Sequence, residues 1–412
     1  MIRILHLSDL HLGTTTHGKI NPHTGINSRI EDFRKALHTC ISEALARGVD
    51  LVLFGGDAFP DATPPPLVQQ AFAEEFRRLE GVPIVFLVGN HDQYAQGQGG
   101  CSLAIYRSLA IPNVIVGDTV ATHGIPTRGG TVQVITLPWL SKSHLLTRQE
   151  LSDLSSSEVE VLFREKLALI LEGEIRQLDP HLPTILLAHV LVEGAELGAE
   201  RFLMTGKGFQ LPLSWFVRPE FTYVALGHVH RHQCLCSDPP VVYAGSLERV
   251  DFGEEQETKG YCWLEITAPH QVSWQFCPLP ARSFCTIRLD VRGRTDPHLA
   301  IIQAINTKMR AGAIVRLIYQ IHAEQLPLVN ESEIHQTLAT SHSYSIQPQI
   351  IPAANFTKTN SLDPLLVADP IQALATYLAT RPDWQNQHLD LLGLARELLH
   401  DASDPQQLAI GL

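Results

Sequence analysis

The stretch VFLVGNHDQY, residues 85–94, runs from apolar residues directly into glycine, an amide, an imidazole and a carboxylate. An apolar run bounded by glycine predicts a buried strand of a parallel sheet, although periodicity alone does not exclude a buried helix. In open α/β sheets, ligands bind at the carboxyl ends of the strands. We therefore expect Asn90, His91 and Asp92 to lie where chemistry is carried out.

Similar strand-like runs recur between residues 3 and 245. They are RILHLS (3–8), DLVLFGG (50–56), PIVFLVG (83–89), TVQVITL (131–137), TILLAH (184–189), TYVALG (222–227) and VVYAG (241–245). A helix is expected between the first two runs, where Ser28 and Glu31 suit a capping box and Gly48 ends the helical spacing. A second long helix is expected over residues 155–179. Strand, helix and strand in succession predict a parallel sheet covered by helices.

After about residue 280 the pattern shortens to strand, helix, strand, helix and strand, which predicts a second, small α/β domain. Residues 352–364 have the composition of a linker, and Asp369 with Pro370 then marks the start of the first of two apolar helices. These helices either pack back on the chain or dock on a partner. We divide the chain into a large domain at 1–280, a small domain at 281–352, and a linker with C-terminal helices at 353–412.

The composition limits the compartment and the partners. The net charge is −12, which argues against a broadly basic surface for nucleic acid but leaves room for a local basic groove. Seven scattered cysteines fit reduced thiols, and Cys234 and Cys236 lack the CxxC spacing of a zinc site. The opening segment MIRILHLSDLHLG lacks a secretory pattern, and the apolar stretches fall short of the roughly 20 residues that span a bilayer. We expect a cytoplasmic protein that does not contact a membrane.

Five polar clusters each follow a strand-like run. They are Asp9-Leu10-His11, Gly56-Asp57, Gly89-Asn90-His91-Asp92, His189 and Gly227-His228-Val229-His230. Any one of them is a weak signal, because a lone histidine after an apolar run is more often structural than a ligand. Together they form a mixed nitrogen and oxygen set that suits manganese, iron or zinc. The set contains no thiolate, which disfavours a closed structural zinc site.

This donor set is large enough for two ions. About seven protein ligands suffice for two five- or six-coordinate ions if one carboxylate bridges them. Alternate side chains of an extended segment point the same way, so Asp9 and His11 can bind one ion, and His228 and His230 can divide between two. Two ions roughly 3.5 to 4 Å apart stabilise both oxygens of an in-line displacement at phosphorus, so the pattern predicts phosphoester hydrolysis.

The cluster after the third strand supplies three different roles. Asn90 can bind an ion through its carbonyl oxygen. His91 is then free to protonate the leaving oxygen or to stabilise developing charge. Asp92 can orient His91 or its neighbours from behind the ligands.

The ordered set DxH, GD, GNHD, H and GHxH resembles the calcineurin-like metallophosphoesterases. That resemblance implies a two-layer β-sandwich flanked by helices. The chain is more similar to one branch, the bacterial SbcD nuclease subunit and its archaeal and eukaryotic double-strand-break repair relatives. The segments that carry this likeness are NPHTGINSRIEDFRKAL (21–37), LVEGAELGAERFLMTG (191–206), and YAGSLERVDFGEE (243–255) with KGY (259–261). It covers roughly residues 1–265, and the remainder is similar mainly in architecture, with a small capping domain at 281–352 followed by partner-binding helices.

The resemblance implies a role for each residue of the set. It assigns one ion to Asp9, His11, Asp57 and His230, and the other to Asp57, Asn90, His189 and His228. Asp57 would bridge the ions, and His91 would be the catalytic histidine. Some relatives carry a histidine three residues after the bridging aspartate, where this chain has Pro60.

The resemblance also implies cofactors and partners. The two ions would be manganese, and the activity that of a 3′ to 5′ double-strand DNA exonuclease and an endonuclease. A homodimer would act with an SbcC-type ABC ATPase that has long coiled coils. Such a partner could supply much of the DNA-binding charge that a chain of net charge −12 lacks.

Several alternatives remain open from sequence. A small-molecule phosphodiesterase or nucleotidase could use the same fold and metals. A metal-free scaffold is disfavoured, because every expected ligand and His91 are present. The segment with Lys19 and Arg29, and the one with Arg201, Lys207 and Arg218, could approach phosphates or be ordinary solvated surface.

Overall fold

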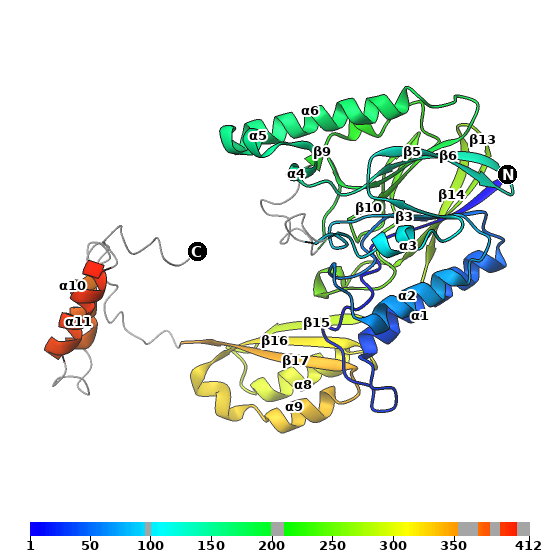
Figure 1. Ribbon diagram of the computed structural model, residues 1–412. Coiled ribbons are helices and arrows are strands. Elements are labelled where there is room, and N and C mark those ends of the chain that lie inside the picture. Colours follow the sequence, from blue (N-terminus) through cyan, green and yellow to red (C-terminus); the bar gives the residue numbers. More distant parts are fainter. Residues whose placement is uncertain (95–99, 199–209, 353–369, 380–387, 402–412) are drawn as a thin grey trace. The chain divides into compact units, whose positions relative to one another are not determined.

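The computed structural model describes residues 1–94, 100–198, 210–352, 370–379 and 388–401 (Figure 1). The chain forms two compact units. The first contains Met1–Ile321 and Pro327–Gln349, and the second contains His322–Leu326 and the described residues from Ile350 onward. The division into domains at residues 280 and 352 stays a prediction.

The first sheet has six strands in the order β14-β13-β1-β2-β3-β4. Their bounds are β1 (Ile2–Leu7), β2 (Leu51–Phe54), β3 (Ile84–Leu87), β4 (Val114–Gly117), β13 (Gly260–Ala268) and β14 (Gln271–Pro278). Strands β1 to β4 are parallel, whereas β13 and β14 continue the sheet beyond β1 in antiparallel pairs. Every residue of β2 and β3 is buried, as expected for parallel strands covered on both faces.

The second sheet also has six strands, in the order β11-β12-β10-β7-β6-β5. Their bounds are β5 (Ala121–Thr127), β6 (Gly130–Leu137), β7 (Thr184–His189), β10 (Tyr223–Gly227), β11 (Gln233–Ser237) and β12 (Pro240–Tyr243). Its inner face packs on the inner face of the first sheet, where Ile4 and Val85 meet Val134 and Ile185 in one apolar cluster. The two sheets therefore form a sandwich.

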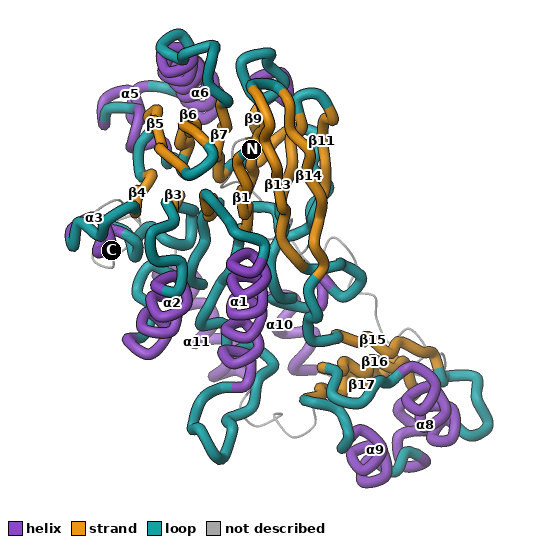
Figure 2. The backbone as a smooth tube through the Cα atoms, turned by 90° about the vertical axis from the view of Figure 1, so that its right-hand side faces the viewer, coloured by secondary structure: helices purple, strands orange, loops and turns teal. Residues whose placement is uncertain are grey.

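Helices cover both outer faces of this sandwich (Figures 1 and 2). On the first sheet lie α1 (Ser28–Ala46) and α2 (Pro66–Arg77), whose Phe33 and Phe72 pack with Phe54. On the second sheet lies α6 (Ser156–Ile175), which buries Phe163 and Leu167. The predicted fold class, a two-layer β-sandwich flanked by helices, is confirmed.

Short elements complete the sandwich. They are α3 (Ala104–Ser108), α4 (Lys142–Leu145), α5 (Arg148–Asp153), the two-stranded sheet of β8 (Leu191–Val192) and β9 (Gln210–Leu211), and the 3₁₀ turns η1 (Leu213–Trp215) and η2 (Phe252–Glu254).

The predicted capping box of α1 is wrong. The side chain of Asn27, one residue before Ser28, accepts the hydrogen bond from the Arg29 backbone N–H and caps the helix. Glu31 instead accepts hydrogen bonds from Asn21 and Thr24, because the loop before the helix folds back over its first turn. The helix does end as expected, two residues before Gly48, whose φ is +73°.

The sequence did not predict the hairpin of β13 and β14. In β14 the burial alternates between exposed and half-buried residues, so this strand offers no continuous apolar run. Its register with β13, and that of β13 with β1, place the hairpin at the edge of the first sheet. The hairpin begins directly after Lys259.

After residue 280 the elements follow the predicted order of strand, helix, strand, helix and strand. They are β15 (Phe284–Asp290), α8 (Pro297–Lys308), β16 (Ile314–His322), η3 (Ala323–Leu328), α9 (Glu331–Leu338) and β17 (Ser343–Ile351). The strands form a three-stranded sheet in the order β15-β16-β17.

Two C-terminal helices, α10 (Pro370–Ala379) and α11 (His388–Asp401), contact each other. The predicted cap Asp369 lies outside the described residues. Docking of these helices on a partner stays a prediction. Within the described ranges, every helix is too short or too polar to cross a membrane.

Candidate metal centre

The expected site residues lie at the carboxyl ends of strands from both sheets. In the first sheet, Asp9 and His11 follow β1, Asp57 follows β2, and residues 90–92 follow β3. In the second sheet, His189 is the last residue of β7, and residues 228–230 follow β10. The sandwich thus brings two strand edges to one place, and each cluster lies at the end of its strand that the sequence predicts.

The backbone at these residues is not extended. The φ angles are +52° at Asp9, +45° at His11, +56° at Asp57 and +96° at His228. The predicted alternation along an extended segment is therefore wrong for Asp9 and His11. Non-glycine residues with positive φ are costly and persist where the surrounding structure imposes them, which is common at functional sites.

Two glycines of the motifs are required by close approach. A Cβ on Gly89 would lie 2.1 Å from Oδ1 of Asp57, and a Cβ on Gly56 would lie 2.4 Å from Nδ1 of His189. Gly56 also has a φ of +98°. These two positions exclude other residue types because functional side chains occupy the space that a side chain would need.

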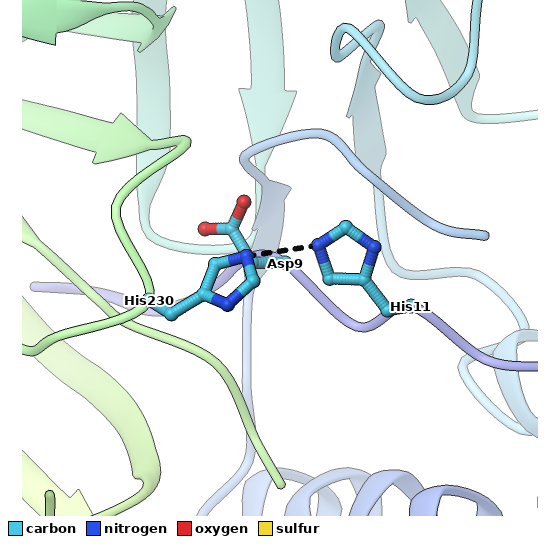
Figure 3. Close-up of side chains that lie close together, drawn as sticks. All are labelled: Asp9, His11 and His230. Atoms are coloured by element: carbon cyan, nitrogen blue, oxygen red, sulfur yellow. Dashed lines mark hydrogen bonds between the residues drawn. The ribbon is translucent and has the colours of Figure 1, made fainter. Parts of the chain in front are cut away.

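One group of donors comes from β1 and β10. Asp9, His11 and His230 each direct one ligand atom to within 4.8 Å of the others. Figure 3 shows the rings of His11 and His230 facing each other beside the Asp9 carboxylate; their Nε2 atoms are 3.0 Å apart. All three residues are buried.

A second group contains Asp57, His189 and His228. Asp57 Oδ2 lies 3.4 Å from His189 Nε2. The carbonyl oxygen of Asn90 is 3.0 Å from His189 Nε2 and 2.9 Å from His228 Nδ1, so it sits between the two imidazoles. Asp57 also belongs to a third group, with His11 and His91, and its Oδ2 is 3.8 Å from His11 Nε2.

These contacts fit divalent ions. Nδ1–H of His189 donates to the Gly55 carbonyl at 2.7 Å, so in the neutral ring Nε2 carries a lone pair that faces two oxygens. Either a proton on Nε2 or a metal ion between these atoms would remove the repulsion among the three lone pairs. The buried Nε2 of His228 has no hydrogen-bond partner among the described residues. Carboxylate, amide oxygen and imidazole nitrogen are the donors that manganese, iron and zinc accept.

The pKa shifts of three of these residues also indicate that the site favours positive charge. Burial lowers the pKa of His189, but the Asp57 carboxylate outweighs it and raises that pKa to about 9. Burial would raise the pKa of Asp57, yet the neighbouring His189 holds it well below its usual range. Burial lowers the pKa of His228 to about 3. A metal ion would compete with the proton on His189, because ligating imidazoles are neutral.

His91 stands at the edge of the donor groups and is half-buried. Its backbone N–H donates to Asp57 Oδ1 at 2.9 Å, and its Nδ1 lies 2.9 Å from the carbonyl oxygen of Pro60. A cleft of about 520 Å³ opens beside it, lined by residues 60–63, 90, 91, 93 and 94. Pro60 thus contributes a backbone acceptor at the position where some relatives carry a histidine.

Asp92 serves the backbone around Asp57. Its fully buried carboxylate accepts hydrogen bonds from the N–H groups of Asp57, Ala58 and Gly89, at 2.9 to 3.0 Å. Burial, followed by the Asp57 charge, raises its pKa to about 6. In the described structure the hydrogen bonds of Asp92 reach the backbone near His91 and do not include the His91 ring; its role in orienting these residues stays a prediction.

Two of the five basic residues expected near phosphates are paired with acidic side chains. Arg29 is fully buried against Asp32, so the suggestion that it approaches DNA is wrong. Arg218 pairs with Glu172 and Glu220. Lys19 is exposed. Arg201 and Lys207 lie outside the described residues.

Sequence reasoning missed Glu254 and Lys259. Glu254 Oε1 is 2.7 Å from His230 Nδ1, and Lys259 Nζ is 2.7 Å from Glu254 Oε2. Both residues lie in the segments 243–255 and 259–261 that carry the family likeness. A fully buried carboxylate and ammonium could not be recognised there without the tertiary contacts.

Comparison with known proteins gives the family. The model of the calcineurin-like phosphoesterases matches residues 2–232, more than half of the chain and every candidate ligand. The chain belongs to the calcineurin-like phosphoesterase family. It is accordingly a metal-dependent phosphoesterase, and the predicted family and enzyme class are confirmed.

Three relatives of this phosphoesterase belong to the branch of SbcD and Mre11 proteins. The SbcD subunit of the SbcCD nuclease from Bacillus subtilis is 25% identical over 287 residues, covering 66% of this chain and 68% of the relative. The protein of the same name from Rhodobacter capsulatus is 29% identical over 327 residues, covering 74% and 75%. The DNA double-strand break repair protein Mre11 of Methanocaldococcus jannaschii is 23% identical over 272 residues, covering 64% and 62%.

All seven cysteines of this phosphoesterase are free. Among the described residues, the groups of side chains that could hold a metal do not include Cys234 or Cys236. Reduced thiols and the absence of a CxxC zinc site stay predictions.

Proposed function

We propose that this chain is the two-metal nuclease subunit of an SbcCD-like DNA repair complex. The observation that carries the proposal is the position of Asp57, whose carboxylate belongs to two of the three donor groups. A carboxylate shared in this way suits the bridge between two ions. We assign Asp9, His11, Asp57 and His230 to one ion, and Asp57, Asn90, His189 and His228 to the other.

The side chains divide the work of phosphodiester hydrolysis. Bound divalent ions, which we propose to be manganese, would activate the attacking water and neutralise charge on the phosphate. Asp57 keeps the two donor groups together, and Asp92 fixes the turn that carries it. The Pro60 carbonyl accepts the Nδ1–H of His91, so when the ring carries a hydrogen on both nitrogens, the opposite nitrogen, Nε2, can give its proton to the leaving oxygen and keep Nδ1–H.

DNA as the substrate is supported by the relatives, which are named as nuclease subunits and as a double-strand break repair protein. The same likeness supports 3′ to 5′ exonuclease and endonuclease activity, an SbcC-type ATPase partner and a homodimer. The alternative, a phosphodiesterase or nucleotidase for small nucleotides, would use the same metals and the same cleft beside His91. Cytoplasmic location stays a prediction.

Hydrolysis assays test the function and the acid together. Linear duplex DNA and bis-p-nitrophenyl phosphate would be offered with Mn²⁺ to the wild type, to His91→Gln, and to the exposed control His181→Gln. We expect manganese-dependent DNA degradation that falls by about 10²- to 10⁴-fold in His91→Gln, as for a lost general acid. Both ions should still bind to that variant.

Two results would change the assignment. Loss of both ions in His91→Gln would make His91 a ligand and not the acid. Turnover of the small ester without DNA cleavage, even after the ATPase partner is added, would favour the small-nucleotide alternative.

The salt dependence of DNA affinity, measured for the isolated chain and for the complex, shows how much of the DNA binding the ATPase partner supplies. We expect the isolated chain to show a shallow slope of log affinity against log salt, and the complex a steep one, because each phosphate contact adds to the slope. An equally steep slope for the isolated chain would show that its own residues bind the phosphates.

A further inference from the structure

The hydrogen bond between His230 and Glu254 suggests how one ligand is prepared for its ion. Oε1 of Glu254 is 2.7 Å from Nδ1 of His230. A carboxylate oxygen can only accept when Glu254 is ionised, so Nδ1 must carry the hydrogen. In the neutral ring, Nε2 then holds the lone pair, and Nε2 is the atom that points at His11.

The Glu254 side chain is held in place from several directions. Its second oxygen, Oε2, accepts from the Lys259 ammonium at 2.7 Å and from the Val250 backbone N–H at 3.0 Å. The Asp251 side chain caps the short turn that ends at Glu254, by accepting from the Gly253 N–H at 2.7 Å. The carboxylate therefore has one orientation available.

Lys259 contacts both Glu254 and the backbone of His230. Besides Glu254, its ammonium donates to the backbone carbonyl of His230 at 3.1 Å and to Glu257 at 2.7 Å. Both Lys259 and Glu254 are buried, so each charge requires the other. Backbone and ring of His230 are thus fixed by one buried ion pair.

We propose that Glu254 is the positioning residue of His230: it selects the Nδ1–H tautomer and aims Nε2 at the ion, while Lys259 holds the carboxylate. This inference rests on the proposed two-metal function. The proposed role of Glu254 and Lys259 explains what the segments YAGSLERVDFGEE and KGY do; without it, these segments only mark the resemblance to the family. Carboxylates behind ligating histidines fix the ring and raise its basicity, and their loss typically weakens metal binding about 10- to 100-fold.

Calorimetric titration of the full chain with Mn²⁺ tests the proposal. In Glu254→Gln we expect one of two sites to weaken by about 10- to 100-fold and the other to stay within about twofold of wild type. The matched control is Glu255→Gln, the next residue, whose carboxylate accepts from the Thr286 N–H and does not contact a candidate ligand in the described structure. Wild-type binding at both sites in Glu254→Gln, or equal weakening of both, would overturn the role.

A second measurement observes the ring in the wild-type chain itself and uses a variant only to assign the signal. Nitrogen-15 spectra of the histidine rings in the metal-free chain, assigned with His230→Gln, report which ring nitrogen carries the hydrogen. The Nδ1–H form of His230 is the expected result, and the Nε2–H form would refute the proposal. If the wild type binds no Mn²⁺ at all, the two-metal function itself fails, and this role falls with it.

Discussion

Two clusters of charged side chains, one buried and one partly buried, differ in how their charges are balanced. The junction cluster consists of Arg29, Asp32, Glu248 and Arg282 and links α1 to the chain that enters β15. There, Arg29 Nη1 donates to Asp32 at 2.7 Å, Arg282 Nε donates to the same carboxylate at 2.5 Å, and the Arg282 backbone N–H donates to Glu248 at 3.0 Å. Each carboxylate has a guanidinium or an N–H as its partner.

The candidate metal centre lacks such partners. In the described part of the chain, the buried Asp9 and Asp57 meet imidazoles and backbone N–H groups, but not a lysine or arginine side chain. Burying carboxylates without a cation is expensive. An unbalanced buried cluster of this kind therefore indicates a bound cation, whereas a balanced one indicates a structural role.

The largest expected effect comes from Asp57→Asn. The amide removes the charge shared by two donor groups, so we expect fewer than two Mn²⁺ ions per chain and turnover reduced to the level without metal. Loss of one preorganised charge alone costs on the order of 10²- to 10³-fold, and here both ions are affected. Calorimetry and hydrolysis assays measure the two quantities.

The control for this variant lies at the other end of the same strand. Asp50 precedes β2 and is also buried, but it pairs with Arg128 at 2.9 Å. Asp50→Asn should keep both ions and the wild-type turnover. If Asp57→Asn bound two ions with unchanged affinity, Asp57 would not be the shared ligand, and the contrast between the metal centre and the junction cluster would fail.

A smaller effect, on stability only, is expected for Arg29→Met. Removing the guanidinium leaves the buried Glu248 and the half-buried Asp32 with less compensation, and breaking a buried pair typically costs about 3 to 5 kcal/mol. Chemical denaturation should show this loss equally with and without Mn²⁺, because Arg29 does not contact the donor groups in the described structure.

On the same helix, Arg34 forms an exposed pair with Glu74 at 2.9 Å. Arg34→Met should change the free energy of unfolding by no more than about 1 kcal/mol. An Arg29→Met chain as stable as Arg34→Met would show that the junction cluster does not stabilise the fold.

The smallest effect concerns pH at the junction. Burial and the nearby Arg282 lower the pKa of His342, whose ring is 2.8 Å from the Ser28 hydroxyl of α1. The unfolded chain binds a proton near pH 6.5 while the folded chain does not, so stability is full above that pH and falls below it. The slope should stay well under the ~1.4 kcal/mol per pH unit of a fully buried group, because solvent screens this half-buried ring.

Melting temperatures between pH 5 and 7 check this expectation. His342→Gln should flatten the pH dependence, whereas the exposed His335→Gln should leave it as in wild type. A steeper acid loss of stability in His342→Gln than in wild type would reverse the assigned direction.

The motifs could be placed from sequence because the relevant signals are local. Apolar runs such as residues 85–88 define strands, and the polar residues that follow them must lie at the carboxyl ends of those strands. The cap of α1 and the β13–β14 hairpin could not be placed in this way. The first depends on a loop that folds back over the helix, and the second has no continuous apolar run.

The sequence by itself determined a sheet covered by helices, the order of the metal-binding motifs and the residues they offer, because strand periodicity and donor chemistry depend on neighbours along the chain; the two-layer sandwich was implied only by the family resemblance. Only the tertiary structure decided which donors meet, that Arg29 is buried, and that Glu254 lies behind His230. Those facts depend on contacts between distant segments: the His228 backbone N–H, for example, reaches the Asp9 carboxylate across 219 positions. Burial and close packing of two sheets set such contacts, and no local pattern encodes them.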